Sequence, residues 1–136
     1  MNEQELYDEV GEEGFTRLIR SFYEQVPEDD ILGPMYPADD MVGAEERLRD
    51  FLLFRFGGVS TYLETRGHPA LRMRHARFQL DQAARDRWMQ LMTNALGKAD
   101  FSPEASTYLQ EFFGGVATFL MNRGPGQTGG PFQITR

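Results

Sequence analysis

The stretch FTRLIRSFYEQV, residues 15–26, decides the fold class, because its apolar side chains recur at every third or fourth position. These side chains are Phe15, Leu18, Ile19, Phe22 and Val26. Side chains at that spacing line one face of an α-helix, whereas a half-buried strand would alternate apolar and polar residues. Pro27 ends the pattern, since proline lacks the backbone N–H that a continuing helix uses. The stretch therefore predicts an amphipathic helix with one buried face.

The same spacing recurs on both sides of this stretch, and nowhere is there a sustained alternation typical of strands. We therefore predict an all-α chain. Its other helices are expected at residues 3–10, 41–56, 81–96 and 102–120. The prolines after residue 26 predict tight turns, and residues 59–79 leave room for at most one or two short helices.

Residues that favour helix ends flank these helices. Asp39 or Asp40 caps the helix at 41–56 and the glycine pair at 57–58 ends it, while Ser102 caps the last helix. The three faces expected to be buried are Met41, Ala44, Leu48, Phe51, Leu52 and Arg55; Ala84, Trp88, Leu91, Met92 and Ala95; and Leu109, Phe112, Phe113, Val116, Phe119 and Leu120.

A chain of 136 residues with 40% hydrophobic residues predicts one domain, at residues 1–123, followed by a flexible Gly/Pro-rich tail at 124–136. The chain has no cysteine, which excludes disulfide scaffolds, thiol nucleophiles and thiolate metal sites. No apolar run approaches the roughly 20 residues of a membrane span, and the N-terminus is acidic where a secretory signal is basic. We therefore expect a cytoplasmic protein that does not bind membranes.

Both histidines lie in the one basic stretch of an acidic chain. The net charge of −7 argues against nucleic-acid binding. The segment from Arg66 to Arg85 is the exception, because it contains five arginines and a single acidic residue. Any imidazole chemistry must use His68 or His75, but a zinc site made of both would need carboxylate partners, and the turn at His68 matches no zincin spacing. His75 has apolar neighbours and is either a metal ligand in a dry pocket or an ordinary surface histidine.

Tyr23, Tyr36 and Trp88 bring polar groups to positions next to apolar residues. Each is either part of the core, with its polar atom satisfied locally, or a donor aimed at a bound ligand. The acidic pairs at 29–30, 39–40 and 45–46 are interpreted as helix caps and a solvated face, because adjacent residues on a helix point about 100° apart.

Several short motifs together resemble the group II, or O-type, truncated haemoglobins. They are MYP at 35–37, GAEERL at 43–48, GG at 57–58, RGHP at 66–69, LRMRH at 71–75 and Trp88. The resemblance covers residues 5–122 and implies a truncated globin fold, a two-over-two helical sandwich around haem b. Phe56 departs from the pattern, since relatives usually have tryptophan before the glycine pair.

The resemblance also implies a role for each matched residue. His75 matches the proximal iron ligand; Tyr23, Tyr36 and Trp88 match the distal polar residues; Ala44 and Leu48 match the distal gate and the residue over the iron. The candidates for the haem wall, which are otherwise ordinary core residues, are Phe51, Phe54, Tyr62, Met73, Phe78 and Met92. The candidates for the haem propionates are Arg47, Tyr62, Arg66 and Arg72, and the sequence does not select among them.

The function implied is binding of O₂, NO, CO or another small ligand at a His-ligated iron. Each donor to a partly charged ligand contributes about 1.5–3 kcal/mol, or roughly ten- to a hundredfold slower release. The first alternative is a redox enzyme, a nitric oxide dioxygenase or peroxidase, which needs an external reductant because the sequence holds no flavin or nicotinamide module. The second is a cofactor-free helical interaction module. We expect a monomer or homodimer.

Overall fold

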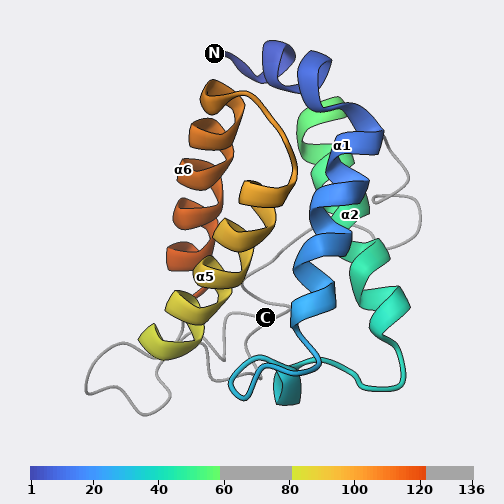
Figure 1. The fold of residues 1–136 in the computed structure, drawn as a ribbon, viewed down its shortest axis with the longest axis vertical. Coiled ribbons are helices and arrows are strands. Elements are labelled where there is room, and N and C mark those ends of the chain that lie inside the picture. The colour runs from blue at the N-terminus through green and yellow to red at the C-terminus, as the bar shows by residue number, and fades with distance from the viewer. Residues whose placement is uncertain (59–80, 122–136) are drawn as a thin grey trace.

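A computed structural model describes residues 1–58 and 81–121 of the chain (Figure 1). Within these ranges the elements are α1 (Glu3–Gln25), the short 3-10 helix η1 (Gly33–Met35), α2 (Met41–Gly57), α5 (Gln82–Lys98) and α6 (Pro103–Leu120). The all-α prediction is confirmed. The predictions outside the described residues concern Tyr62, Arg66, His68, Arg72, Met73, His75, Phe78 and the tail at 124–136.

Helix α1 contains both of the helices expected before Pro27. Asn2 and Glu5 cap its start reciprocally, each side chain accepting the other's backbone N–H. The two parts meet at Gly11, whose φ of 61° is a left-handed backbone conformation that only glycine adopts without strain. After this kink the predicted apolar face is completely buried, from Phe15 to Val26.

Helix α2 begins and ends at capping residues. Asp40, rather than Asp39, is the N-cap, and its side chain accepts the backbone N–H of Gly43. Gly58, with a φ of 70°, is the C-cap, and its N–H donates to the carbonyls of Leu53 and Phe54. Local sequence therefore determines the length of this helix.

The buried face of α2 differs in part from the predicted one. Leu53 and Phe56 are also buried, whereas Arg55 is exposed. The reason is that α2 has neighbours on two sides: the ring of Phe56 stacks on Phe15 of α1, with centroids 5.7 Å apart, and meets Phe112 of α6 edge-on at 4.8 Å. A single stripe at helical spacing underestimates a face that two helices cover.

Helices α5 and α6 both begin at side-chain caps, of which the sequence predicted Ser102. Asp81 accepts the N–H of Ala84, and Ser102 accepts that of Ala105 with Pro103 in the first helical position. On α6 the buried positions end at Phe113, and Phe119 is 57% exposed, so its predicted burial is wrong. The face of α6 that lies in the core is therefore shorter than the apolar stripe.

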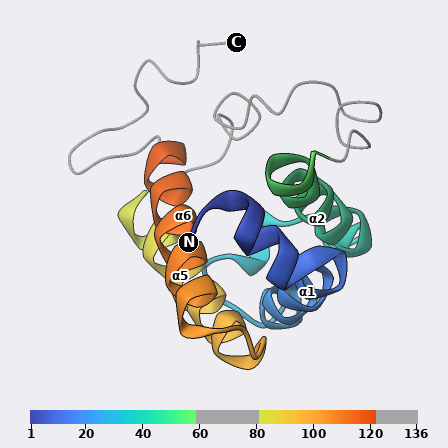
Figure 2. The same cartoon turned by 90° about the horizontal axis from the view of Figure 1, so that it is seen from above.

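The helices pack as two pairs. Helix α1 contacts α2, α5 contacts α6, and α1 also contacts both helices of the second pair. Viewed from above, α1 and α2 lie on one side and α5 and α6 on the other (Figure 2). This is the predicted two-over-two arrangement, with one apolar core between the pairs. None of the described helices is long and apolar enough to span a bilayer.

Candidate functional site

Three polar aromatic side chains from three different segments meet in the core. Tyr23 lies near the end of α1, Tyr36 directly follows η1, and Trp88 lies on α5. The rings of Tyr23 and Tyr36 meet edge-on, with centroids 5.5 Å apart. The Tyr36 hydroxyl is hydrogen-bonded with the side chains of both Tyr23 and Trp88. Residues far apart in the sequence thus share one polar cluster.

The chemistry of the groups determines one direction and a proton count. An indole N–H is only a donor, so Trp88 donates to the Tyr36 oxygen. The phenols of Tyr23 and Tyr36 share the other hydrogen bond, in which either can be the donor. The three groups carry three protons and share two hydrogen bonds, so one phenol proton is not used within the cluster.

Both phenols are neutral at physiological pH. Burial raises the pKa of Tyr23 far above its usual value, and Tyr36 beside it adds to the effect. Tyr36 is partly exposed as a residue but its hydroxyl is enclosed, and burial raises its pKa to about 12 although the two hydrogen bonds act against the shift. Each phenol therefore keeps its proton as a hydrogen-bond donor.

We expect the free energy of unfolding to fall as the pH rises from 10 to 12. Tyr36 loses its proton near its usual pKa of 10.0 when unfolded and near 12 when folded. Its stabilising contribution is therefore complete below pH 10 and is lost as the pH rises toward 12. Urea unfolding over this pH range should show a shallower loss in Tyr36→Phe than in the unmodified protein. An identical pH dependence would refute the assigned burial of this hydroxyl.

The indole of Trp88 is held between two other helices. Phe22 of α1 lies 5.3 Å from it and Phe113 of α6 lies 5.6 Å from it, measured between ring centroids. Phe22 also meets Tyr23 edge-on at 5.2 Å. These contacts restrict the indole ring, so its N–H is a fixed donor rather than a mobile one.

The remaining apolar candidates of the described part lie on α2 and α5. Ala44 and Phe51 are buried, Leu48 and Phe54 are partly buried, and Met92 is fully buried. All of them belong to the same apolar cluster as Tyr23 and Trp88 or pack against it. Their roles as distal gate and haem wall remain predictions, since ordinary core packing accounts for the same burial.

Arg47 is the one propionate candidate within the described residues. Its guanidinium pairs with Asp40 at 3.2 Å, and both side chains are substantially exposed. Its positive charge acts to lower the pKa of Tyr23, against the larger effect of burial. Arg47 is therefore near the tyrosine pair while its head group contacts solvent.

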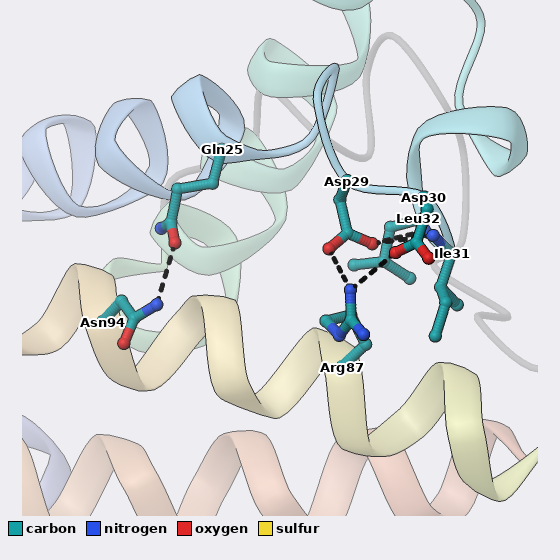
Figure 3. Close-up of polar contacts among 7 residues, drawn as sticks. All are labelled: Gln25, Asp29, Asp30, Ile31, Leu32, Arg87 and Asn94. Atoms are coloured by element: carbon teal, nitrogen blue, oxygen red, sulfur yellow. Dashed lines mark hydrogen bonds and ion pairs between the residues drawn. The ribbon is translucent and has the colours of Figure 1, made fainter.

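The sequence interpretation missed a buried ion pair beside this cluster (Figure 3). The side chain of Asp29 is only 7% exposed and lies 2.5 Å from Arg87 Nη1. The prediction of a solvated acidic face is therefore wrong for Asp29, whereas Asp30 is 84% exposed and contacts Arg87 at 2.9 Å. The two partners are separated by 58 positions, so no local pattern indicates their contact.

Asp29 also holds the loop that follows α1. Its second carboxylate oxygen accepts the N–H groups of Ile31, at 3.0 Å, and Leu32, at 2.7 Å. Burial acts to raise the pKa of Asp29, but the hydrogen bonds from Leu32 and Arg87 outweigh it and place the pKa below the usual 3.8. Aspartate accepting N–H groups two and three residues ahead is a common turn signal, and it is the part of this feature that the sequence contains.

A second polar contact joins α1 to α5. The Gln25 amide donates to the carbonyl of Leu91 at 2.9 Å. It also accepts from Asn94 at 3.1 Å (Figure 3). It lies further along α5 than the ion pair and contacts the end of α1 rather than the loop.

Acidic or histidine ligands for a metal do not gather within residues 1–58 and 81–121: no group of three or more is present there. His75, the predicted iron ligand, lies outside these ranges. In the described part, the polar aromatic cluster is therefore the feature that distinguishes the core from ordinary apolar packing.

Comparison with known proteins points to one family. Residues 5–122 match the bacterial-like globins. The chain is 32% identical over 103 residues to a group 2 truncated hemoglobin of Bacillus subtilis, covering 76% of this chain and 77% of the relative. Among solved structures, a thermostable hemoglobin from Thermobifida fusca is 45% identical with a TM-score of 0.82, over 86% of this chain and 96% of that one. A truncated oxygen-avid haemoglobin from Bacillus subtilis is 30% identical with a TM-score of 0.80, over 86% and 98%.

Proposed function

Because this chain belongs to the bacterial-like globin family, we propose that it holds haem b through His75 and binds O₂ or another diatomic ligand beside Tyr36. Membership of the family makes the protein a globin-type haem protein that binds small ligands. The haem supplies, when bound, an iron with a coordination position open to such a ligand. The proposal also assigns the residues that donate hydrogen bonds to the bound ligand.

The observation that carries the proposal is the hydrogen-bond arrangement of Tyr36. Its hydrogen bonds with Trp88 and Tyr23 use two of the three protons of the cluster, which leaves one phenol proton to donate. A core that only had to be packed would gain nothing from three converging polar groups, since burying them costs free energy unless each is hydrogen-bonded. A ligand that accepts a hydrogen bond would complete the set.

The residues around the cluster fit a haem. The porphyrin needs apolar surfaces, and Leu48, Phe51 and Phe54 supply them along α2 within the cluster that includes Trp88. A bound ligand needs a donor that stays neutral, and burial keeps Tyr36 protonated up to a pH of about 12. The similarity to a haemoglobin described as oxygen-avid supports O₂ as the ligand.

We expect Tyr36→Phe to raise the O₂ dissociation rate by roughly ten- to a hundredfold. The substitution removes a hydrogen bond to a partly charged acceptor, worth about 1.5–3 kcal/mol. Trp88→Phe should raise the rate as well, because it removes the N–H that orients the Tyr36 hydroxyl. Stopped-flow release measurements test both.

Tyr7→Phe is the matched control. It deletes the same hydroxyl from a tyrosine that stacks on Phe15, at the other end of α1, and should leave the rate unchanged. Rates that are unchanged in both Tyr36→Phe and Trp88→Phe would refute the proposed donor role.

A further inference from the structure

We propose that Asp29 and Arg87 are positioning residues for Tyr36. Their ion pair fixes the loop that carries Tyr36 against the turn of α5 that carries Trp88, and in this way sets the rate of ligand release. The expected effect of the ion pair on ligand release rests on the proposed function of Tyr36. Its expected effect on the indole of Trp88 does not.

A continuous series of short hydrogen bonds connects Asp29 with Tyr36. The Asp29 carboxylate accepts the N–H of Leu32, and its backbone carbonyl accepts that of Gly33 at 3.0 Å. The Leu32 carbonyl accepts the N–H of Met35 at 2.9 Å, and the Gly33 carbonyl accepts that of Tyr36 at 3.2 Å. The backbone of Tyr36 therefore moves with Asp29 as one compact turn.

Arg87 attaches this turn to α5. It is the residue directly before Trp88, and it contacts Asp29 through a carboxylate that is almost completely buried (Figure 3). Charged hydrogen bonds of this kind are about twice as strong as neutral ones, and breaking a buried one leaves an uncompensated charge. Because the ion pair and the Tyr36–Trp88 hydrogen bond join the same two segments, weakening the first loosens the second.

Trp88 provides a direct readout, because it is the only tryptophan in the chain. Its indole N–H gives a single identifiable signal in a nitrogen-labelled NMR spectrum of the haem-loaded protein under carbon monoxide. In Asp29→Asn, which keeps the shape of the side chain but removes its charge, we expect this signal to shift and its exchange with solvent to rise about tenfold. The O₂ dissociation rate should rise about tenfold as well, the change that corresponds to losing roughly one hydrogen bond.

Two matched controls separate positioning from general loosening. Asp30→Asn removes the exposed partner of the same arginine and should change neither readout, since exposed ion pairs contribute little. Asn94→Ala removes one of the two hydrogen bonds that Gln25 of α1 makes with α5 and leaves the loop unchanged. It should leave the indole signal in place.

Further variants strengthen the test. Arg87→Lys keeps the positive charge and should retain most of the wild-type behaviour, whereas Arg87→Gln removes the charge and gives a second reading of the broken ion pair if Asp29→Asn folds poorly. Adding Asp29→Asn to Tyr36→Phe should cause no further increase in release rate, because a positioning residue has no effect once the residue that it positions is absent.

Different results would overturn the positioning role of Asp29 or the donor role of Tyr36. An indole signal unchanged in Asp29→Asn, or shifted equally in Asn94→Ala, overturns the inference. Faster release in Tyr36→Phe with no change in Asp29→Asn overturns it as well. Unchanged release rates in both Tyr36→Phe and Trp88→Phe refute the proposed donor role, while an indole shift confined to Asp29→Asn still supports the positioning of Trp88 and Tyr36.

Discussion

We expect His75→Ala to abolish or displace the intense Soret absorption of the haem-loaded protein. A globin-type haem protein needs one imidazole on the iron, and this chain contains two histidines and no cysteine. The resemblance to truncated haemoglobins assigns the ligand to the second histidine of the sequence RGHPALRMRH, residues 66–75. Removing it leaves no other matched ligand, so the expected effect is loss of the site rather than a change in its affinity. A visible absorption spectrum measures it.

His68→Ala is the control for this experiment. It removes the only other imidazole, from a Gly-His-Pro sequence, and should leave the Soret band unchanged. Added imidazole should restore the band in His75→Ala by occupying the space of the lost side chain. A band of full intensity and unchanged position in His75→Ala would contradict the assignment. An unmodified protein that stays colourless with ample haem would favour the cofactor-free helical module instead.

Phe113→Ala lowers the free energy of unfolding by about 3–5 kcal/mol. The ring is almost completely buried, contacts Trp88 at 5.6 Å and Phe112 at 5.5 Å, and is the last fully buried position on α6. Its removal takes apolar surface out of the core and leaves a cavity beside the indole, where the surrounding helices relax only in part. Urea unfolding followed by circular dichroism, at equal haem saturation, measures the loss.

Phe119→Ala makes the same substitution on the same helix at a residue that is 57% exposed. Most of its ring is already in contact with water, so the expected loss is well under that of Phe113→Ala. Equal losses in the two variants would show that the ring of Phe119 is as deeply buried as that of Phe113, which contradicts the structure.

Local sequence was sufficient to predict most of the helix ends. Asp40, Asp81 and Ser102 cap helices through side-chain oxygens that reach N–H groups only three residues away. Such contacts need no other part of the chain, which is why a capping residue followed by an apolar period predicts them. The exposure of Phe119 and the burial of Phe56 were not predictable in this way, since they depend on which helices lie alongside.

The polar cluster was predictable only in part. The resemblance named Tyr23, Tyr36 and Trp88 together, but their sequence positions do not indicate that the three groups share hydrogen bonds. The arrangement around Tyr36 depends on the approach of three segments, and it is this approach that leaves one proton available.

The sequence by itself determined the all-α class, the helix caps and the family, because each of these depends on residues close together in the chain or on a matched motif. Only the tertiary structure decided that Asp29 is buried against Arg87, 58 positions away, and that Trp88 donates to Tyr36. The physical reason is that a cap is satisfied within one helical turn, whereas an ion pair or a hydrogen bond between segments exists only after the apolar faces of α1 and α5 have packed and brought those segments together.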